Sequence, residues 1–263
     1  MSEVTVAPPV VLPPFLGHLL QGNNVTLLYT SCLFAIFGAL HFTGKALPNF
    51  PLTDREKGEW NVRCVSTVNA IVCTLGSFVC LWDARNYTPE QCIYGFAPVT
   101  TFFCRLFLGY LLFDLLLEIG FGAPVLRNPT AVIHHTLWVF LNSYVLAYDV
   151  MPSTFSWLTL GEISTPCLNA RWFLAVTKQE KSKLYLTNGV ALMVLFFFAR
   201  VVVYGIGLWH TWSLRELYMP PKHPYMHMGI VLLASIGYAL NLYWMTLIIK
   251  GAARAFRRQK KQH

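Results

Sequence analysis

The chain has 263 residues and a formal net charge of +8, and its composition is that of a membrane protein. Hydrophobic residues make up 55% of it and charged residues only 12%, whereas soluble domains carry about 25% charged residues. We therefore assign the basic residues to membrane surfaces and predict no nucleic-acid partner. The seven cysteines are scattered without a C-x-x-C pair, so neither a disulfide framework nor a zinc site is predicted.

The chain begins with a short proline-containing segment, residues 1–24, which lacks the basic region of a cleavable signal peptide. A first transmembrane helix is predicted over 25–44. Because about 20 apolar residues cross a bilayer as a helix, the remaining pattern predicts five or six further spans. The full set is 25–44, 62–82, 98–119, 130–150, 153–177, 186–209 and 226–249. The fifth contains Glu162, Pro166 and Arg171, which favours a kinked helix buried among its neighbours.

The distribution of basic residues predicts the orientation of these spans. With seven spans, one side of the membrane collects Lys45, Arg55, Lys57, Lys178, Lys181, Lys183, Lys250, Arg254, Arg257, Arg258, Lys260 and Lys261, and the other has Arg85, Arg215 and Lys222. Cytosolic segments carry the excess of Lys and Arg, so the basic tail 250–263 is predicted to be cytosolic and residues 1–24 lumenal. If the fifth segment does not cross, the N-terminal half is inverted.

Short motifs agree with this orientation. The chain ends in KKQH, a dilysine pattern that a retrieval coat of the endoplasmic reticulum reads on cytosolic tails; the alternative is a plain basic flank. Asn86 opens a glycosylation sequon in a predicted lumenal loop, and Asn24 opens another. An integral, multi-pass protein of the endoplasmic reticulum is predicted.

Polar side chains recur in the apolar spans, where each is costly and is a functional candidate. In 130–150, His134, Trp138 and Asn142 form one stripe at i, i+4 and i+8, and His135 lies beside it. The other helices add Asn69, Tyr110, Asp114, Glu162, Ser164, Asn169 and Arg171. The seven-span topology places most of them in the cytosolic half. The predicted fold class is therefore all-α, a polytopic bundle of six to seven helices around a lipid-accessible cavity.

The adjacent histidines favour acyl transfer. A neutral imidazole can accept a proton from an attacking amine or hydroxyl, or accept the acyl group itself. Asp114 and Glu162 are candidates for orienting acids, and the amide side chains are candidates for oxyanion donors. The alternative is that these groups only join helices through interhelical hydrogen bonds. Adjacent residues of a helix cannot both ligate one ion, so no metal site is predicted.

Four motifs in successive spans resemble the TLC domain, the module of ceramide synthases. They are KGEWNVRCVSTVNA, GYLLFDLLL, IHHTLWVFLNSYVLAY and GEISTPCLNARWFL, and the resemblance covers residues 57–258. The last is most similar to small TLC domain-containing proteins of the transmembrane-protein-56 type. The resemblance implies a lipid-accessible helix bundle and a role in lipid homeostasis.

The resemblance also assigns roles. In ceramide synthases the histidine pair that His134 and His135 match is catalytic in acyl transfer from acyl-CoA. This chain departs from the synthases in having GEIST in place of a stretch with two aspartates, and Asn69 where relatives often have histidine. Sphingoid N-acylation therefore does not carry over directly. Two functions stay open: an acyl-CoA-dependent acyltransferase acting on a lipid amine or hydroxyl with no other cofactor, and a non-catalytic lipid-binding, sensing or regulatory protein.

Overall fold

The computed structural model describes residues 24–44, 48–95, 97–120, 129–218 and 224–260, and they contain helices and no strands. The helices are α2 (Asn24–Thr43), α3 (Asp54–Ala84), α4 (Pro89–Tyr94), α5 (Pro98–Gly120), α6 (Pro129–Tyr148), α7 (Pro152–Thr159), the 3₁₀ segment η2 (Leu160–Ser164), α8 (Thr165–Val176), α9 (Lys183–Phe196), the π-helical segment η3 (Phe197–Val203), α10 (Tyr204–Ser213), α11 (Arg215–Tyr218) and α12 (Pro224–Lys260). The predicted all-α class is confirmed.

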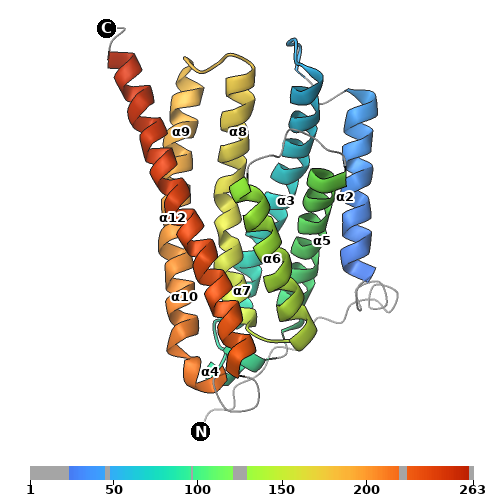
Figure 1. Ribbon diagram of the computed structural model, residues 1–263, viewed down its shortest axis with the longest axis vertical. Coiled ribbons are helices and arrows are strands. Elements are labelled where there is room, and N and C mark those ends of the chain that lie inside the picture. Colours follow the sequence, from blue (N-terminus) through green and yellow to red (C-terminus); the bar gives the residue numbers. More distant parts are fainter. Residues whose placement is uncertain (1–23, 45–47, 96, 121–128, 219–223, 261–263) are drawn as a thin grey trace.

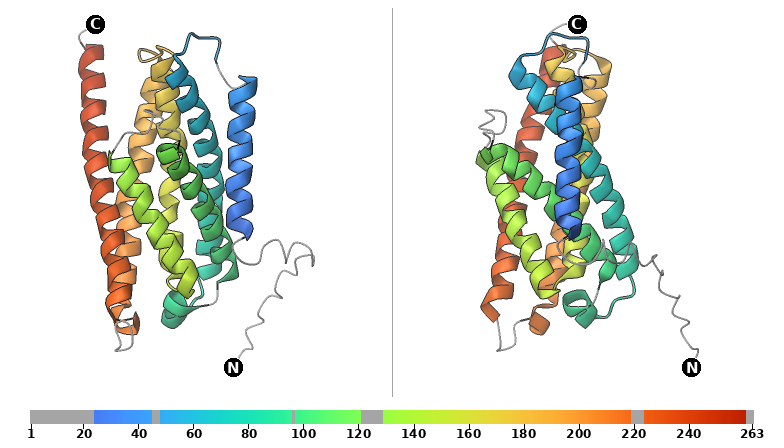
Figure 2. Two further views of the ribbon diagram at one scale, coloured as in Figure 1. Left: turned by 45° about the vertical axis from the view of Figure 1, so that its right-hand side comes forward. Right: turned by 90° about the vertical axis from the view of Figure 1, so that its right-hand side faces the viewer.

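The long helices run alternately along one axis (Figures 1 and 2). α2 ascends in Figure 1, α3 descends, α5 ascends and α6 descends. The continuous run α7–η2–α8 ascends, α9–η3–α10 descends, and α12 ascends to the end marked C. The start of α2 and the end of α12 therefore lie at opposite ends of the bundle, as expected for an odd number of passages.

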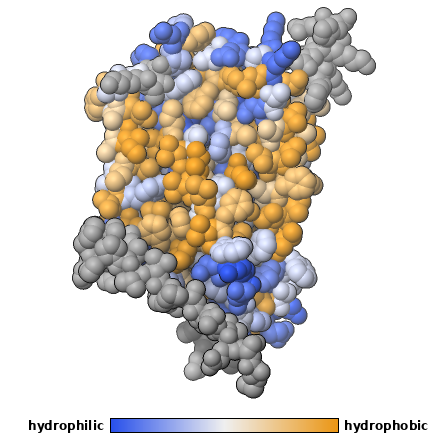
Figure 3. All heavy atoms as spheres, turned by 180° about the vertical axis from the view of Figure 1, so that it is seen from behind, coloured by the Kyte–Doolittle hydropathy of each residue, from blue (hydrophilic) through white to orange (hydrophobic). Residues whose placement is uncertain are grey.

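Five helical segments are long and apolar enough to cross a membrane: Asn24–Thr43, Asp54–Ala84, Pro89–Leu117, Lys183–Ser213 and Met228–Arg254. The face in Figure 3 shows an apolar belt with hydrophilic surface above and below it. The segments outside this set, α6 and α7–η2–α8, also run along the bundle but carry most of the predicted polar residues. Their burial among the apolar helices explains how polar side chains are accommodated at membrane depth. The chain is a multi-pass integral membrane protein.

Local sequence sets the ends of these helices. Prolines open α4, α5, α6, α7 and α12, because the first helical position needs no N–H donor and proline's fixed φ suits it. Thr53 caps α3 in a reciprocal pair with Glu56. The turn from α6 to α7 consists of residues 149–151 and places Asp149 and Met151 at positive φ (49° and 55°).

Two irregular segments meet inside the bundle. Pro166 cannot donate the backbone hydrogen bond that a regular helix would direct to residue 162, and the chain forms 3₁₀ segment η2 just before it. η3, a π-helical widening between α9 and α10, packs against η2. π-Helical turns occur frequently at functional sites, and this one carries the buried Arg200.

Some sequence predictions fall outside the described residues. They include most of the N-terminal segment 1–24, Lys45, and the last three residues of the KKQH tail. The Asn86 sequon is described: Asn86 is exposed, and Thr88 is the N-cap of α4, with its hydroxyl accepting from the Gln91 backbone N–H.

Candidate functional site

The site is centred on a carboxylate–imidazole pair between α5 and α6. His135 Nδ1 lies 2.6 Å from Asp114 Oδ2. Asp114 is almost completely buried, with 3% of its side chain exposed, and His135 keeps 20%. The contact is an ion pair when the imidazole is protonated. In either protonation state the His135 ring is oriented with Nδ1 toward the Asp114 carboxylate.

The pair lies about two turns from the neighbouring ends of α5 and α6. α5 and α6 end well below the upper ends of α8 and α9 in Figure 1. Asp114 lies about two turns before the end of α5, and His135 about two turns after the start of α6. Both residues therefore lie below the upper ends of α8 and α9.

His134 has different surroundings from its neighbour. It is buried, and its ring packs edge-on against Trp244 of α12 and Trp138 of α6, with centroids 5.0 and 6.2 Å away. Trp244 in turn donates from Nε1 to the Thr130 hydroxyl, at 3.2 Å. His134 thus fills an aromatic enclosure between α6 and α12, and only His135 contacts the carboxylate.

A chain of hydrogen bonds connects α5 to α3 and α8. Tyr110, one turn before Asp114, donates to the Ser66 hydroxyl at 3.2 Å. Asn169 Nδ2 lies 3.3 Å from Ser66 Oγ and 3.0 Å from Thr67 Oγ1. Its Oδ1 accepts from Arg63 at 3.1 Å. The structure therefore brings Tyr110 and Asn169 together through Ser66.

Asn69 faces the bundle interior from α3. Its Oδ1 accepts from the hydroxyl of Tyr29 on α2 at 3.2 Å and from the Cys73 thiol at 3.6 Å. The first helix, which lies outside the region of family resemblance, therefore contributes a side chain to the interior.

Glu162 is located in a second cluster. It pairs with Arg200 of η3 at 2.9 Å and accepts from the Thr165 hydroxyl at 2.9 Å. Arg200 Nε also donates to Ser164 Oγ at 3.1 Å. Within the described residues, the polar contacts of Glu162 go to this cluster and not to the histidines. The structure thus separates the two predicted acids, and Asp114 alone contacts an imidazole.

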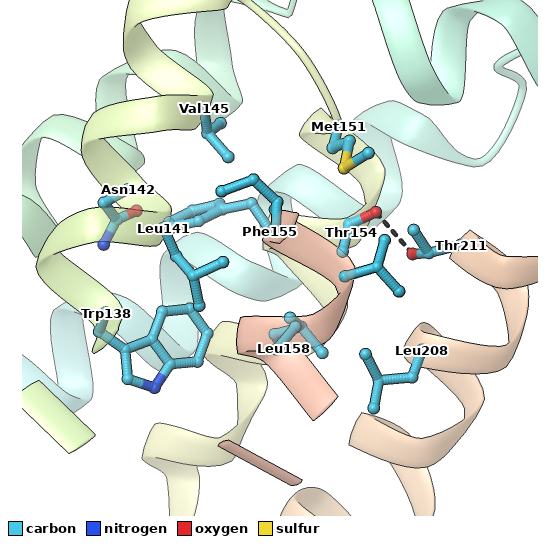
Figure 4. Close-up of a pocket in the computed structure, with 13 residues that line it drawn as sticks. Trp138, Leu141, Asn142, Val145, Met151, Thr154, Phe155, Leu158, Leu208 and Thr211 are labelled. Atoms are coloured by element: carbon cyan, nitrogen blue, oxygen red, sulfur yellow. Dashed lines mark hydrogen bonds between the residues drawn. The ribbon is translucent and has the colours of Figure 1, made fainter. Parts of the chain in front are cut away.

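Asn142 lies on the lower part of the α6 stripe. Its Oδ1 accepts from the Cys104 thiol of α5 at 2.9 Å. With Trp138 it lines a cavity of about 20 Å³ among α6, α7, α10 and α12, whose size suits one water molecule. The close-up of this cavity shows mostly apolar side chains, with the Thr154–Thr211 hydrogen bond of 2.7 Å on one side (Figure 4).

Arg171 does not join the other predicted residues. It is two positions after Asn169, about 200° farther round the helix, and its guanidinium stacks on the Tyr185 ring of α9 at 4.3 Å. It lines a groove between α8, α9 and α12. Arg171 therefore lies outside the polar interior in which the structure places the other predicted site residues.

Several interior amide and imidazole atoms are buried without a hydrogen-bond partner among the described residues. They include Asn61 Oδ1, Asn69 Nδ2, His134 Nδ1, Asn142 Nδ2, and both polar side-chain atoms of Asn241. Buried polar atoms are almost always satisfied, and a half-satisfied set of donors and acceptors indicates a region that binds water or a polar ligand group. No group of three or more metal-binding side chains occurs in the described part of the chain.

Sequence reasoning missed several participants. Ser66, Tyr29 and Trp244 carry no clear signal in the sequence, because single hydroxyl and aromatic residues in apolar helices are common. The i, i+3 spacing of Ser66 and Asn69 in α3 was the available signal. Arg200 is a further participant, and its carboxylate partner is Glu162.

Comparison with known proteins identifies the family. The TLC domain family model matches residues 59–250. TLC domain-containing protein 4 of Xenopus tropicalis is 31% identical over 228 residues, covering 83% of this chain and 85% of the relative. The 4-A protein of Xenopus laevis is 30% identical over 263 residues, covering 95% and 93%, and the human protein 4 is 28% identical over 235 residues, covering 86% of each. The family resemblance inferred from the sequence motifs is confirmed, and the chain belongs to the TLC domain family.

Proposed function

We propose that the protein transfers an acyl chain from acyl-CoA to the amine or hydroxyl of a membrane lipid at the His135–Asp114 pair. The observation that supports this most strongly is the 2.6 Å contact between a nearly buried carboxylate and a partly exposed imidazole. A carboxylate that fixes the tautomer of a histidine and stabilises its imidazolium is the arrangement by which enzymes make a general base.

The reaction follows from the orientation of the ring. Because Nδ1 faces Asp114, Nε2 is the atom that exchanges a proton with the substrate. It accepts the proton of the lipid hydroxyl or amine as that oxygen or nitrogen attacks the thioester carbonyl carbon. The tetrahedral intermediate then collapses, the carbon–sulfur bond breaks, and the imidazolium returns its proton to the departing thiolate. The products are the acylated lipid and free coenzyme A thiol.

The surroundings support the same reaction class. Tyr110 approaches the His135 ring edge-on, with centroids 6.4 Å apart, and is itself fixed by Ser66. Trp138 and the apolar cavity next to it continue from the histidines along α6. The side chains that continue from the histidines are thus mostly apolar, as is usual for the surroundings of a site that binds an apolar reactant.

The proposal includes a location. We place the protein in the membrane of the endoplasmic reticulum with its C-terminus in the cytosol. The basic residues Lys57, Lys178, Lys181 and Lys183 lie at helix ends on the side of the bundle where α12 ends. The positive-inside rule makes that side cytosolic, and KKQH then faces a retrieval coat. Acyl-CoA is present on the same side.

The test uses full-length protein in phosphatidylcholine vesicles that contain a long-chain amine and diacylglycerol as acceptors, with acyl-CoA added. Mass spectrometry should detect an acylated acceptor with the wild type and none above background with His135→Ala. The matched control is His210→Ala, because that histidine lies in α10 at the opposite end of the bundle. Product formation by His135→Ala at the wild-type rate would refute the proposal.

A second function is favoured by one observation. Several buried amide atoms of the interior have no hydrogen-bond partner among the described residues. A lipid headgroup that binds without being turned over would supply such partners. In that case the same assay would recover unaltered lipid with the purified protein, and added acyl-CoA would not be consumed.

A further inference from the structure

A groove of about 280 Å³ lies between α8, α9 and α12, away from the His135–Asp114 pair. Its walls are apolar and largely uncovered: Leu168, Val190 and Leu247 expose 45%, 41% and 44% of their surface. These residues come from three helices of a membrane-spanning bundle, so they face hydrocarbon chains when the protein is in a bilayer. The groove is therefore suited to an acyl chain along its length.

One side of the groove holds an immobilised cation. The Arg171 guanidinium stacks on the Tyr185 ring at 4.3 Å. It also lies directly over Gly189, where an added Cβ would be only 2.6 Å from Nη1. The absence of a side chain at position 189 thus lets the guanidinium lie against α9. An arginine fixed in this way presents its remaining N–H groups in one direction.

A second cation lies on the opposite helix. Arg254 of α12 also lines the groove and is exposed. The lining contains no carboxylate, and neither arginine forms an ion pair with another described residue. Arginine pairs favour phosphate, which they bind with two parallel hydrogen bonds. The charge of the groove is therefore complementary to a phosphate group, not to a cationic or neutral one.

The position of the cations agrees with a lipid ligand. Arg254 and Arg171 belong to the parts of α12 and α8 that approach the basic end of the bundle, where headgroups are expected. On α12, Gly251 has no atom within 4 Å of an added Cβ, so open space extends beside it into the groove.

We infer that this groove binds one anionic phospholipid from the surrounding leaflet, with its phosphate between Arg171 and Arg254 and an acyl chain along the apolar walls. The site is separate from the proposed acyl-transfer pair and does not depend on it. The bound lipid is a structural or regulatory ligand that bridges α8, α9 and α12.

The experiment measures lipid binding to the full-length protein by native mass spectrometry in phosphatidylcholine nanodiscs that contain 10% phosphatidylglycerol. The variants are the pair Arg171→Gln/Arg254→Gln, which removes the charges, and Gly251→Phe, which fills the groove. Matched controls are Arg215→Gln, an arginine at the other end of the bundle, and Gly38→Phe, a glycine with equally open surroundings on α2. Size-exclusion profiles verify that each variant is folded.

The expected result is one tightly bound phosphatidylglycerol per chain for the wild type and both controls. The double arginine variant should bind it about tenfold or more weakly, since each basic contact near a headgroup contributes about a factor of five, and Gly251→Phe should lose it. Equal binding of phosphatidylcholine, equal binding by the double arginine variant, or displacement by millimolar inorganic phosphate would overturn the inference. A dimer that the double arginine variant dissociates would assign the groove to a second copy and also overturn it.

Discussion

Successive residues of a helix point about 100° apart, and this gives the adjacent histidines different chemical environments. His135 faces α5 and the Asp114 carboxylate, whereas His134 faces α12 and its tryptophan. Sequence alone predicts that both imidazoles are inside the bundle and cannot decide between them, because the choice depends on where the neighbouring helices pass. The sequence predicts that His135 pairs with Asp114 or Glu162. In the structure it contacts Asp114, and Glu162 contacts Arg200 instead.

Glu162 and Arg200 should behave as a buried ion pair with a structural role. Arg200→Met leaves the Glu162 carboxylate with 14% exposure and no compensating charge, and breaking a buried pair in this way typically costs about 3–5 kcal/mol. We expect a clear loss of thermal stability in detergent micelles. The Glu162→Met/Arg200→Met double variant should recover most of it, since neither charge remains. Equal stability of the single variant and the wild type would contradict the pairing.

At the scale of the elements, close helix contacts depend on small residues. An added Cβ on Gly207 of α10 would be 2.5 Å from Cβ of Trp157 on α7, an atom that cannot move away by rotation of its side chain. The kinked fifth segment was predicted from Pro166 and its polar residues. The π-helical widening in the next segment was not, because the sequence of η3, apart from Arg200, is that of an ordinary apolar helix.

Gly207→Ala should therefore destabilise the bundle by about 1–3 kcal/mol, the range for overpacking in a filled interior. Thermal unfolding in micelles measures it. Gly38→Ala is the control, because nothing lies within 4 Å of its added Cβ, and it should match or slightly exceed the wild type. If both variants unfold at the wild-type temperature, α7 and α10 are not packed as described.

The first helix should be held to the rest of the bundle in part by Tyr29. Tyr29→Phe removes its hydrogen bond to Asn69, and interhelical hydrogen bonds in membranes contribute about 0.6–2 kcal/mol. We expect a loss of stability in this range, whereas Tyr243→Phe, at a half-exposed position of α12, should have no effect. Losses of the same size in both variants would show that the Tyr29 contact is not specific.

At the scale of the whole molecule, the sequence was sufficient for the all-α class, the membrane location and the alternating passages, because hydropathy and prolines act locally along the chain. It was not sufficient for the pairing of side chains, because that pairing depends on which helices pass beside one another and so on contacts between distant segments. The separation of Arg171 from Asn169 is by contrast a local property, since the two side chains point about 200° apart on one helix.

The orientation of the chain in the membrane can be measured in sealed microsomes, with one epitope at the N-terminus and another at the C-terminus. We expect added protease to remove the C-terminal epitope and spare the N-terminal one, because the basic loops and α12 end on one side. Protection of the C-terminal epitope would reverse the orientation and place acyl-CoA on the wrong side for the proposed reaction.

The most direct test of the proposed chemistry is a double-mutant cycle on thiol release from acyl-CoA with His135→Ala, Asp114→Asn and the double variant. Residues that act as one unit are strongly non-additive. Each single variant should therefore lower the rate by about 10²–10⁴-fold, and the double variant should be no slower than His135→Ala alone. Fully additive losses, or an Asp114→Asn protein as fast as the wild type, would show that the carboxylate and the imidazole do not work together.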